Sequence, residues 1–292
     1  MIRLKALTKR FKRLTVLDAL ELEVAQGERI ALVGSNGAGK TTMIRCLLGE
    51  YTFSGTVEID GKSPRAHRAQ VLHKVGFVPQ LPPPLKMPVK ELLRFSAAVS
   101  GTRVQAIEDL ALRLGLDVKA FAAQPFFKLS GGQKQKLLIA IALGRDAELL
   151  IMDEPAANLD PEARHVFFSL LAERAAKATM IISSHRLDEV ASLVNRVIEL
   201  DRGKVVLDDR VADAPLSGVL ACTVRLRRAD PAIAKALGEW GFTAGPEGVE
   251  WTGVVAGPDR LRFMGMLSRY VGLLVKVSLD EQAAPASLRV VS

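Results

Sequence analysis

A glycine-rich loop between a predicted strand and a predicted helix constrains the fold of this chain more than any other feature. Residues 30–33 are apolar, residues 34–42 read GSNGAGKTT, and residues 43–48 follow with a helical pattern. Glycines let the backbone curl so that successive N–H groups point at phosphate oxygens, and the helix start adds partial positive charge. A plain glycine-rich turn is the alternative, but Lys40 and Thr41 at the end of the loop favour a nucleoside triphosphate site.

The loop also assigns chemistry to single residues. Lys40 can reach the β- and γ-phosphates, and the hydroxyl of Thr41 can bind Mg²⁺. The candidate nucleotide-binding residues of the loop are Gly34, Ser35, Asn36, Gly37, Ala38, Gly39, Lys40, Thr41 and Thr42.

An acidic pair follows a second apolar run. Residues 148–153 read ELLIMD, and Glu154 comes next. An aspartate after an apolar strand fits the Mg²⁺-organising partner of a phosphate loop, so Asp153 is a candidate metal ligand. The adjacent Glu154 can accept a proton from the attacking water or orient it. An ordinary acidic turn is the alternative, which the upstream phosphate loop disfavours.

Composition indicates an ordinary globular protein. The chain has 292 residues, 49% apolar and 25% charged, with a net charge of +8. This length predicts two domains, and the basic excess suits nucleotide, an anionic membrane surface, nucleic acid or a solvated face. The two cysteines, Cys46 and Cys222, lack metal-ligand or disulfide-framework spacing. Charged residues interrupt the most apolar stretch, 137–152, and no secretory signal is visible, so any role at a membrane is expected to run through a partner.

The hydrophobic pattern predicts an α/β fold. Alternation at 2–7, 16–24 and 54–61 predicts an antiparallel sheet, and later apolar strands alternating with helices predict a mostly parallel sheet with helices on both faces. Strands are expected at 75–80, 148–153 and 179–184, helices at 131–143, 161–177 and 187–195, helical structure over 89–115, and a hairpin at 197–206. The proline-rich residues 81–91 predict a stiff, exposed connection suited to docking of a partner.

A linker-like stretch at 212–218 divides the chain. We expect one domain over 1–214, with a helical subdomain at about 85–145, and a small α+β domain over 219–292. In the second domain the predicted order is β-α-β-β-α-β, the ferredoxin-like arrangement. Its expected strands are 222–227, 242–245, 248–255 and 273–279, and its expected helices are 231–241 and 259–271.

The segment LSGGQ at 129–133 points to a protein family. Ser130 is a predicted N-cap, and the two glycines after it leave backbone N–H groups at the helix start, which suits an anion. Between a phosphate loop and a strand ending in Asp-Glu, this segment resembles the signature of ATP-binding cassette (ABC) ATPases. The rest of that family's pattern occurs in order within residues 2–210: Phe11, Gln80, the Ala-Asn-Leu-Asp at 157–160, and His185.

The resemblance implies a role for each of these residues. Two cassettes are expected to dimerise head to tail, and Phe11 is expected to stack on adenine. Gln80 is expected to contact Mg²⁺ and the attacking water, and His185 to hold the γ-phosphate. Glu154 is implied as the general base or water-positioning group, and Asp160 as the residue that communicates across the dimer. ATP would lie between the phosphate loop of one cassette and Ser130, Gly131, Gly132 and Gln133 of the other.

Two departures from the family pattern are small. Phe11 stands where tyrosine is commoner, which keeps stacking but loses a hydroxyl. Lys134-Gln135-Lys136 follows the signature where arginine is usual, which keeps charge but weakens bidentate geometry. Neither removes a catalytic group, so the resemblance implies a competent ATPase that uses ATP and Mg²⁺.

One copy of each motif indicates one cassette per chain. The resemblance therefore implies a transporter subunit that pairs with a second copy or a homologous cassette. It would contact integral-membrane permease subunits and lie peripherally on the cytoplasmic face of the inner membrane. Residues 86–101 and 187–206 resemble exporters of the ABC-2 group, which include subunits serving copper-enzyme maturation.

Other readings stay open. A soluble, non-transport ABC ATPase acting as a regulatory or nucleic-acid-associated factor is the alternative. Translation factors of the family usually carry two cassettes, and chromosome-maintenance ATPases insert a long coiled coil, so both fit less well. The C-terminal domain could pack and dimerise, bind a small regulator, or bind RNA. Since Trp251 is the one base-stacking aromatic on its expected strands, we expect no direct nucleic-acid partner.

Overall fold

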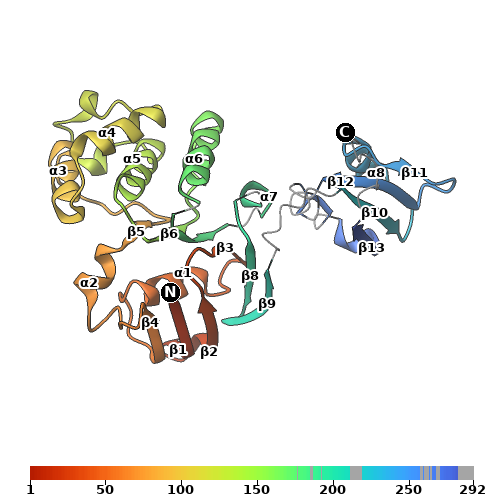
Figure 1. Ribbon diagram of the computed structural model, residues 1–292, viewed down its shortest axis with the longest axis horizontal. Coiled ribbons are helices and arrows are strands. Elements are labelled where there is room, and N and C mark those ends of the chain that lie inside the picture. The colour runs from red at the N-terminus through yellow and green to blue at the C-terminus, as the bar shows by residue number, and fades with distance from the viewer. Residues whose placement is uncertain are drawn as a thin grey trace, which may run out of the picture. The chain divides into compact units, whose positions relative to one another are not determined.

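The computed structural model describes every residue except 176, 185, 186, 192, 211–218, 257, 258, 260–262, 264, 268, 269 and 282–292. The chain divides into two compact units, each described by itself (Figure 1). The N-terminal unit comprises Met1–His185 and Leu193–Val211, and the C-terminal unit comprises Arg186–Ser192 and Ala212–Ser292. The expected linker at 212–218 lies outside the described residues.

A six-stranded sheet organises the N-terminal unit. In spatial order its strands are β5 (Val75–Val78), β6 (Leu149–Asp153), β7 (Thr179–Ser183), β3 (Arg29–Val33), β8 (Arg196–Asp201) and β9 (Lys204–Arg210). The first five pair in parallel, and β9 returns antiparallel to β8 as the expected hairpin. Every residue of β6 and β7 is buried, because both faces of these strands are covered. The prediction of a mostly parallel sheet is confirmed.

A three-stranded antiparallel sheet completes the strands of this unit. Its order is β2 (Leu14–Val24), β1 (Ile2–Phe11) and β4 (Ser54–Ile59). The buried side chains of the alternating strands share one core with helix α1 (Lys40–Leu47) and with β3. The helix that follows the glycine-rich loop is therefore held on its apolar side by Met43, Ile44 and Leu47, all at 0% exposure. This packing gives the loop a rigid base.

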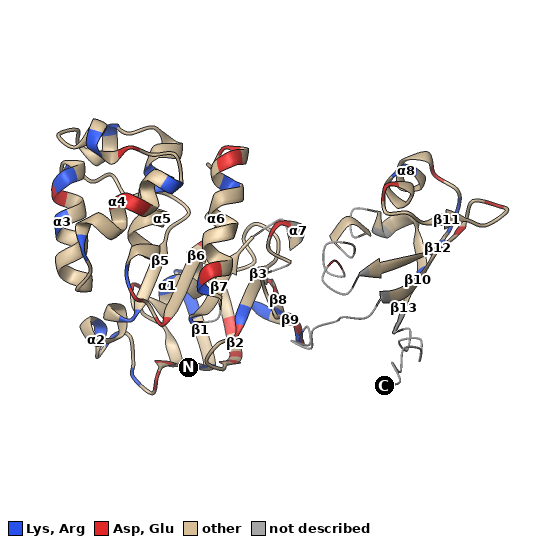
Figure 2. Cartoon of the chain, turned by 45° about the horizontal axis from the view of Figure 1, so that its top comes forward, with Lys and Arg blue, Asp and Glu red and all other residues tan. Residues whose placement is uncertain are grey.

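Helices form a layer beside the parallel sheet (Figure 1). They are α2 (Arg68–His73), α3 (Val89–Ser100), α4 (Val104–Arg113), α5 (Gly131–Gly144) and α6 (Pro161–Arg174), with 3₁₀ turns η1 (Val118–Phe121) and η2 (Phe126–Lys128). Gly101, at φ 69°, separates α3 from α4 within the region expected to be helical. A Cβ on Gly144 would lie 2.9 Å from Ile107, so α4 and α5 pack closely. In Figure 2, acidic and basic positions are interspersed along α3 and α6 rather than separated by sign.

One expected helix is shorter than predicted. Helix α7 spans Leu187–Val190, whereas the sequence pattern extended it to residue 195. Asn195 instead pairs with the start of β3, because its backbone N–H donates to Arg29 O at 2.9 Å and its side-chain oxygen accepts from Arg29 N at 2.8 Å. A residue that leads into β8 in this way cannot continue a helix.

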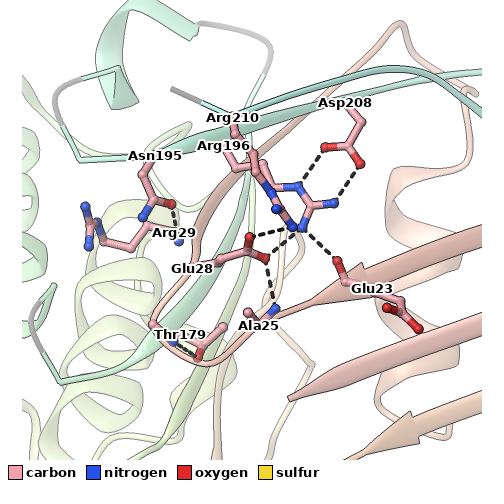
Figure 3. Close-up of polar contacts among 10 residues, drawn as sticks. Glu23, Ala25, Glu28, Arg29, Thr179, Asn195, Arg196, Asp208 and Arg210 are labelled. Carbon is pink, nitrogen blue, oxygen red and sulfur yellow. Dashed lines mark hydrogen bonds and ion pairs between the residues drawn. The ribbon is translucent and has the colours of Figure 1, made fainter. Parts of the chain in front are cut away.

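An ionic cluster ties the β8–β9 hairpin to the rest of the unit (Figure 3). The Arg196 side chain, 5% exposed, donates two hydrogen bonds to Asp208 at 2.7 and 2.6 Å. It also donates to Glu28 Oε2 and to the Glu23 carbonyl, both at 2.7 Å. The hydrogen bonds from Arg196 lower the pKa of Asp208. The buried guanidinium of Arg196 thus has hydrogen-bond partners on all sides, and these bonds hold β9 against the rest of the unit.

The C-terminal unit is built on an antiparallel sheet. Its strands lie in the order β11 (Thr243–Ala244), β12 (Glu250–Ala256), β10 (Val219–Leu226) and β13 (Leu274–Glu281), and α8 (Pro231–Glu239) follows β10. The first and last strands are neighbours and the second lies at the edge, which is the order of the expected ferredoxin-like arrangement. Part of the second expected helix, 259–271, lies outside the described residues. Phe242 stacks on Phe263 with ring centroids 5.0 Å apart in its core.

Candidate nucleotide-binding site

A polar cavity of about 320 Å³ opens at the carboxyl ends of the parallel strands. The lining residues come from the glycine-rich loop, from β2, and from the residues that follow β5 and β6. They are Val16, Ser35, Asn36, Gly37, Ala38, Gly39, Lys40, Thr41, Thr42, Gln80, Asp153 and Glu154. Segments far apart in the sequence thus meet where parallel strands end, and most of the predicted site residues line a single cavity.

Close packing explains the glycines of the loop. Gly34 has φ 142°, and a Cβ there would lie 2.3 Å from the carbonyl oxygen of Leu200. Gly39 has φ 111°, and a Cβ there would lie 2.8 Å from Leu17. A side chain at either position would push the loop away from the strands that support it. The ammonium of Lys40 lies inside the curl, donating to the carbonyl oxygens of Gly34 at 2.7 Å and Ser35 at 3.2 Å.

The acidic pair is held by a serine that the sequence analysis did not single out. Ser183, the last residue of β7, is in register with Asp153 and donates to its carboxylate at 2.6 Å. The Ser183 hydroxyl also accepts a hydrogen bond from the backbone N–H of Glu154 at 2.9 Å. Glu154 has φ 49°, a left-handed conformation that is uncommon for a residue with a side chain. The serine therefore orients one carboxylate and fixes the backbone of the other.

The donor set suits a small, hard cation. Asp153 is 2% exposed, and its carboxylate lines the same cavity as Thr41 and Gln80. Carboxylate, hydroxyl and amide oxygens beside a phosphate-binding loop are the ligands that Mg²⁺ prefers. Among the described residues there is no cluster of three or more His, Cys, Asp or Glu side chains that could hold a metal ion. The site therefore fits Mg²⁺ held jointly by the protein and the phosphates.

Phe11 does not line this cavity. Its ring packs edge-on against Tyr51, with centroids 5.3 Å apart, and the Lys9 ammonium lies 4.6 Å from its centroid. Phe11 is still 41% exposed. Val16, on the neighbouring strand, contributes to the lining and was not among the predicted site residues.

The signature segment, residues 130–133, also lies apart from the cavity lining. Ser130 caps α5 as predicted: its hydroxyl accepts from Gln133 N at 3.2 Å, and the Gln133 side chain accepts from Ser130 N at 2.9 Å. This capping box fixes the start of a 14-residue helix. The segment is thus a rigid helix terminus with two glycines, and it does not contribute to the cavity of its own chain.

Asp160 and His185 complete the predicted set. Asp160 caps α6, accepting from Ala163 N at 2.9 Å, and its carboxylate lies 2.7 Å from the Lys136 ammonium. The hydrogen bond from Lys136, followed by that from Ala163, lowers the pKa of Asp160. His185 lies outside the described residues.

Sequence comparisons identify relatives of this chain. The sequence profile of the family described as "ABC transporter" matches residues 17–157. "Nod factor export ATP-binding protein I" of Ralstonia nicotianae is 33% identical over 215 residues, which are 70% of this chain and 66% of that protein. A "Putative ABC transporter ATP-binding protein" of Streptomyces avermitilis is 36% identical over 205 residues, 68% of this chain and 77% of that protein. "Phosphonates import ATP-binding protein PhnC" of Rhizobium etli is 29% identical over 238 residues, 75% of this chain and 84% of that protein.

A solved structure shares the fold. The structure described as "Dimeric Structure of MJ0796, a Bacterial ABC Transporter Cassette" superposes with a TM-score of 0.64 at 25% sequence identity. The similarity covers 73% of this chain and 99% of that one.

Proposed function

Because this chain belongs to the ABC transporter family of ATP-binding proteins, we propose that it is the ATP-hydrolysing subunit of a membrane transporter, driving a separate permease. The chain is an ATPase that uses ATP and Mg²⁺. One observation carries the proposal. The phosphate loop, Gln80, Asp153 and Glu154 line one cavity, whereas the signature segment of the same chain stays outside it. The chain thus carries the phosphate-binding cavity and the signature segment at different places. In a pair of cassettes, the cavity of one chain would face the signature segment of the other.

The cavity residues divide the work of hydrolysis. The loop N–H groups and Lys40 bind the β- and γ-phosphates, where charge develops in the transition state. Thr41, Gln80 and Asp153 would hold Mg²⁺, which would supply positive charge to neutralise the phosphates. Glu154 orients the attacking water and accepts its proton. Ser183 links the Asp153 carboxylate to the Glu154 backbone, because its hydroxyl donates to the carboxylate and accepts from the Glu154 N–H.

The second half of the site comes from another cassette. We expect the helix terminus at Ser130, Gly131, Gly132 and Gln133 to close on the γ-phosphate bound by the partner, with Asp160 near the dimer interface. A capped helix start offers N–H donors and a positive partial charge to an anion. The dimeric cassette of similar fold supports this pairing. Phe11 with Val16 is proposed for adenine, and His185 for the γ-phosphate.

The permease contact is proposed on the proline-rich stretch after Gln80. Exposed apolar side chains lie there, among them Leu81 at 77% and Met87 at 38%, and Phe127 at 42% lies on a neighbouring segment. The two segments are joined by hydrogen bonds from Phe126 N to Met87 O and from Phe127 N to Leu85 O. No helix in the described part of the chain is long and apolar enough to span a bilayer. A peripheral position on the cytoplasmic face of the inner membrane, through the permease, follows from this proposal.

Export is the favoured direction. Residues 86–101 and 187–206, which resemble the ABC-2 group, and the relatives named for Nod factor export support an exporter. A role in the maturation of a metalloenzyme is proposed on the ABC-2 resemblance alone. The phosphonate import relative marks the competing direction. Co-purification of the full chain with the membrane proteins encoded beside it tests transport: a multispanning partner is expected, and its consistent absence would favour a non-transport ATPase.

Hydrolysis has a separate test. Glu154→Gln keeps the size of the side chain but removes its basicity, so ATP turnover should fall by about 100-fold or more. The variant should retain ATP and elute as a dimer in size-exclusion chromatography with ATP, and as a monomer without it. Turnover at the native rate would show that Glu154 does not have the proposed role.

A further inference from the structure

A second cavity lies among the helices of the N-terminal unit. Its volume is about 440 Å³, which is within the range of small-molecule sites. Its walls come from α3, from the first half of α4, and from the turn η1 with the residue that follows it. Helices α3 and α4 lie beside each other (Figure 1). The residues that line this cavity are different from those that line the nucleotide-binding cavity, so it is a separate site.

Backbone contacts hold the walls of this cavity together. The Lys90 N–H, in the first turn of α3, donates to the carbonyl oxygen of Ala122 at 3.0 Å, which joins α3 to the end of η1. Asp117 caps η1, because its side chain accepts a hydrogen bond from Lys119 N at 3.0 Å. Gly101, at φ 69°, makes the turn between α3 and α4. The cavity is therefore framed by backbone whose position is fixed by the fold.

The base of the cavity is apolar. Leu93 is 2% exposed and Val118 is 4% exposed, so both side chains are held by the surrounding core. Val104 and Ala122 also line the cavity and are half-buried. Surface of this kind stabilises the methylene groups of a ligand by removing them from water. A ligand that fills the cavity therefore needs an apolar part.

The rim of the cavity is positively charged. Lys90, Arg94 and Lys119 are exposed, and their side chains make no hydrogen bond or ion pair with any residue that the structure describes. Lys90 and Arg94 are four residues apart and so lie on the same face of α3. In the described lining, Glu108 adds one negative charge against these three positive ones. Three solvated cations alone make an ordinary basic surface, but here they border a cavity with an apolar base.

We propose that this cavity binds a small amphipathic anion, a carboxylate or a phosphate ester with an apolar tail. The head group pairs with Lys90, Arg94 and Lys119, and the tail lies on the apolar base. The guanidinium of Arg94 suits such a head group, because it can donate two parallel hydrogen bonds to a carboxylate or a phosphate. Glu108 weakens the attraction, since like charges repel. The site uses none of the residues proposed for ATP, so it does not depend on the proposed function.

Binding of decanoate to the full chain tests this proposal, with calorimetric titration below the concentration at which decanoate forms micelles. We expect saturation at one molecule per chain, no competition by ATP with Mg²⁺, and shifts of the methyl NMR signals of Leu93, Val104 and Val118. Octanoate, which is two methylenes shorter, should bind about tenfold more weakly. Inorganic phosphate, which lacks the tail, and decyltrimethylammonium, which reverses the charge, should not bind measurably at the same concentrations.

Variants of the full chain separate charge from shape, and urea unfolding shows that each one is folded. Arg94→Gln and Lys119→Gln should each weaken decanoate binding about threefold or more, because each removes a rim charge. Glu108→Gln should tighten it about twofold, because it removes the opposing charge. Ala122→Leu keeps every charge but places a larger side chain in the cavity, so binding should weaken about tenfold or more. Lys235→Gln, at an exposed lysine of α8, is the matched control and should bind like the native chain.

Native affinity in Ala122→Leu would overturn the proposal, because decanoate would then bind outside the cavity. Equal weakening in Lys119→Gln and Lys235→Gln would overturn it too, since only the net charge of the chain would then attract the anion. Binding to phosphatidylglycerol vesicles but not to decanoate would instead assign the three cations to a membrane surface. Each of these results leaves the proposed function intact, which is refuted separately by native ATP turnover in Glu154→Gln.

Discussion

The two units of the chain differ in where they keep polar and strained residues. In the described chain, all eight buried polar or charged residues lie in the N-terminal unit: Lys9, Lys40, Gln135, Asp153, Thr179, Ser183, Ser184 and Arg196. The non-glycine residues with positive φ, Glu154 among them, also lie there. The buried side chains described in the C-terminal unit form an apolar core around Phe242, Phe263 and Trp251.

This difference indicates that the two units have different roles, one structural and one chemical. A packed apolar core stabilises a shape, and its parts can be exchanged for others of similar volume. Buried polar groups and left-handed residues lower stability unless their neighbours compensate, so they mark places where chemistry or coupling is carried out. We therefore interpret the N-terminal unit as the site of ATP chemistry, and we propose that the C-terminal unit is a packing and dimerisation module.

The strongest test of this contrast compares two crowded glycines. Gly34→Ala places a Cβ 2.3 Å from Leu200 O at φ 142°. It should destabilise the N-terminal unit by about 3 kcal/mol or more and abolish ATP turnover. Gly253→Ala places a Cβ 2.6 Å from the Phe242 ring and should destabilise the C-terminal unit by about 1–3 kcal/mol with native turnover.

Urea unfolding and ATP turnover of both full-length variants at 25 °C measure the difference. Native turnover in Gly34→Ala, or lost turnover in a folded Gly253→Ala, would break the contrast between the units.

A second test compares the two ends of one strand. Ser183→Ala removes the hydroxyl that bridges Asp153 and Glu154, so stability should fall by about 1–3 kcal/mol and kcat by about tenfold or more. Thr179→Val, at the other end of β7, removes the acceptor for Gly27 N and should cost about 1 kcal/mol without changing kcat. Steady-state kinetics beside chemical unfolding distinguish the two. Equal effects on kcat would mean that the serine acts through stability alone.

The smallest expected effect concerns acid stability. Arg196 holds the pKa of Asp208 below its ordinary value of 3.8. A depressed carboxyl pKa stabilises the fold at pH values above the ordinary one, and this contribution is lost as the pH falls through the lowered pKa. Asp208→Asn should therefore lower stability at pH 7 and reduce the further loss between pH 5 and pH 3. The Asp208 side chain is 38% exposed, so we expect about 1 kcal/mol or less.

Unfolding of native and Asp208→Asn chains at the three pH values checks this prediction. An unchanged pH dependence in Asp208→Asn would show that the ion pair does not contribute to acid stability.

Local patterns predicted most of the fold and of the cavity. The glycine-rich loop, the strand ending in Asp153, and the Ser130 and Asp160 caps depend on residues close in sequence, and the structure has each of them in the expected place. Ser183 was missed because its role follows from the register of β7 against β6. The packing of Phe11 on Tyr51 joins residues forty positions apart, which hydrophobic periodicity does not encode. Helix α7 was predicted too long because the pairing of Asn195 with β3 is likewise a long-range contact.

The left-handed backbone at Glu154 has a consequence for protein engineering. Glycine and asparagine adopt φ 49° more readily than glutamate does, so replacing Glu154 by either relieves an unfavourable backbone dihedral and removes the base. A library of variants selected only for resistance to heat would accumulate such replacements at this position and lose activity as it gained stability. At position 154, selection for stability and selection for ATP turnover therefore favour different residues.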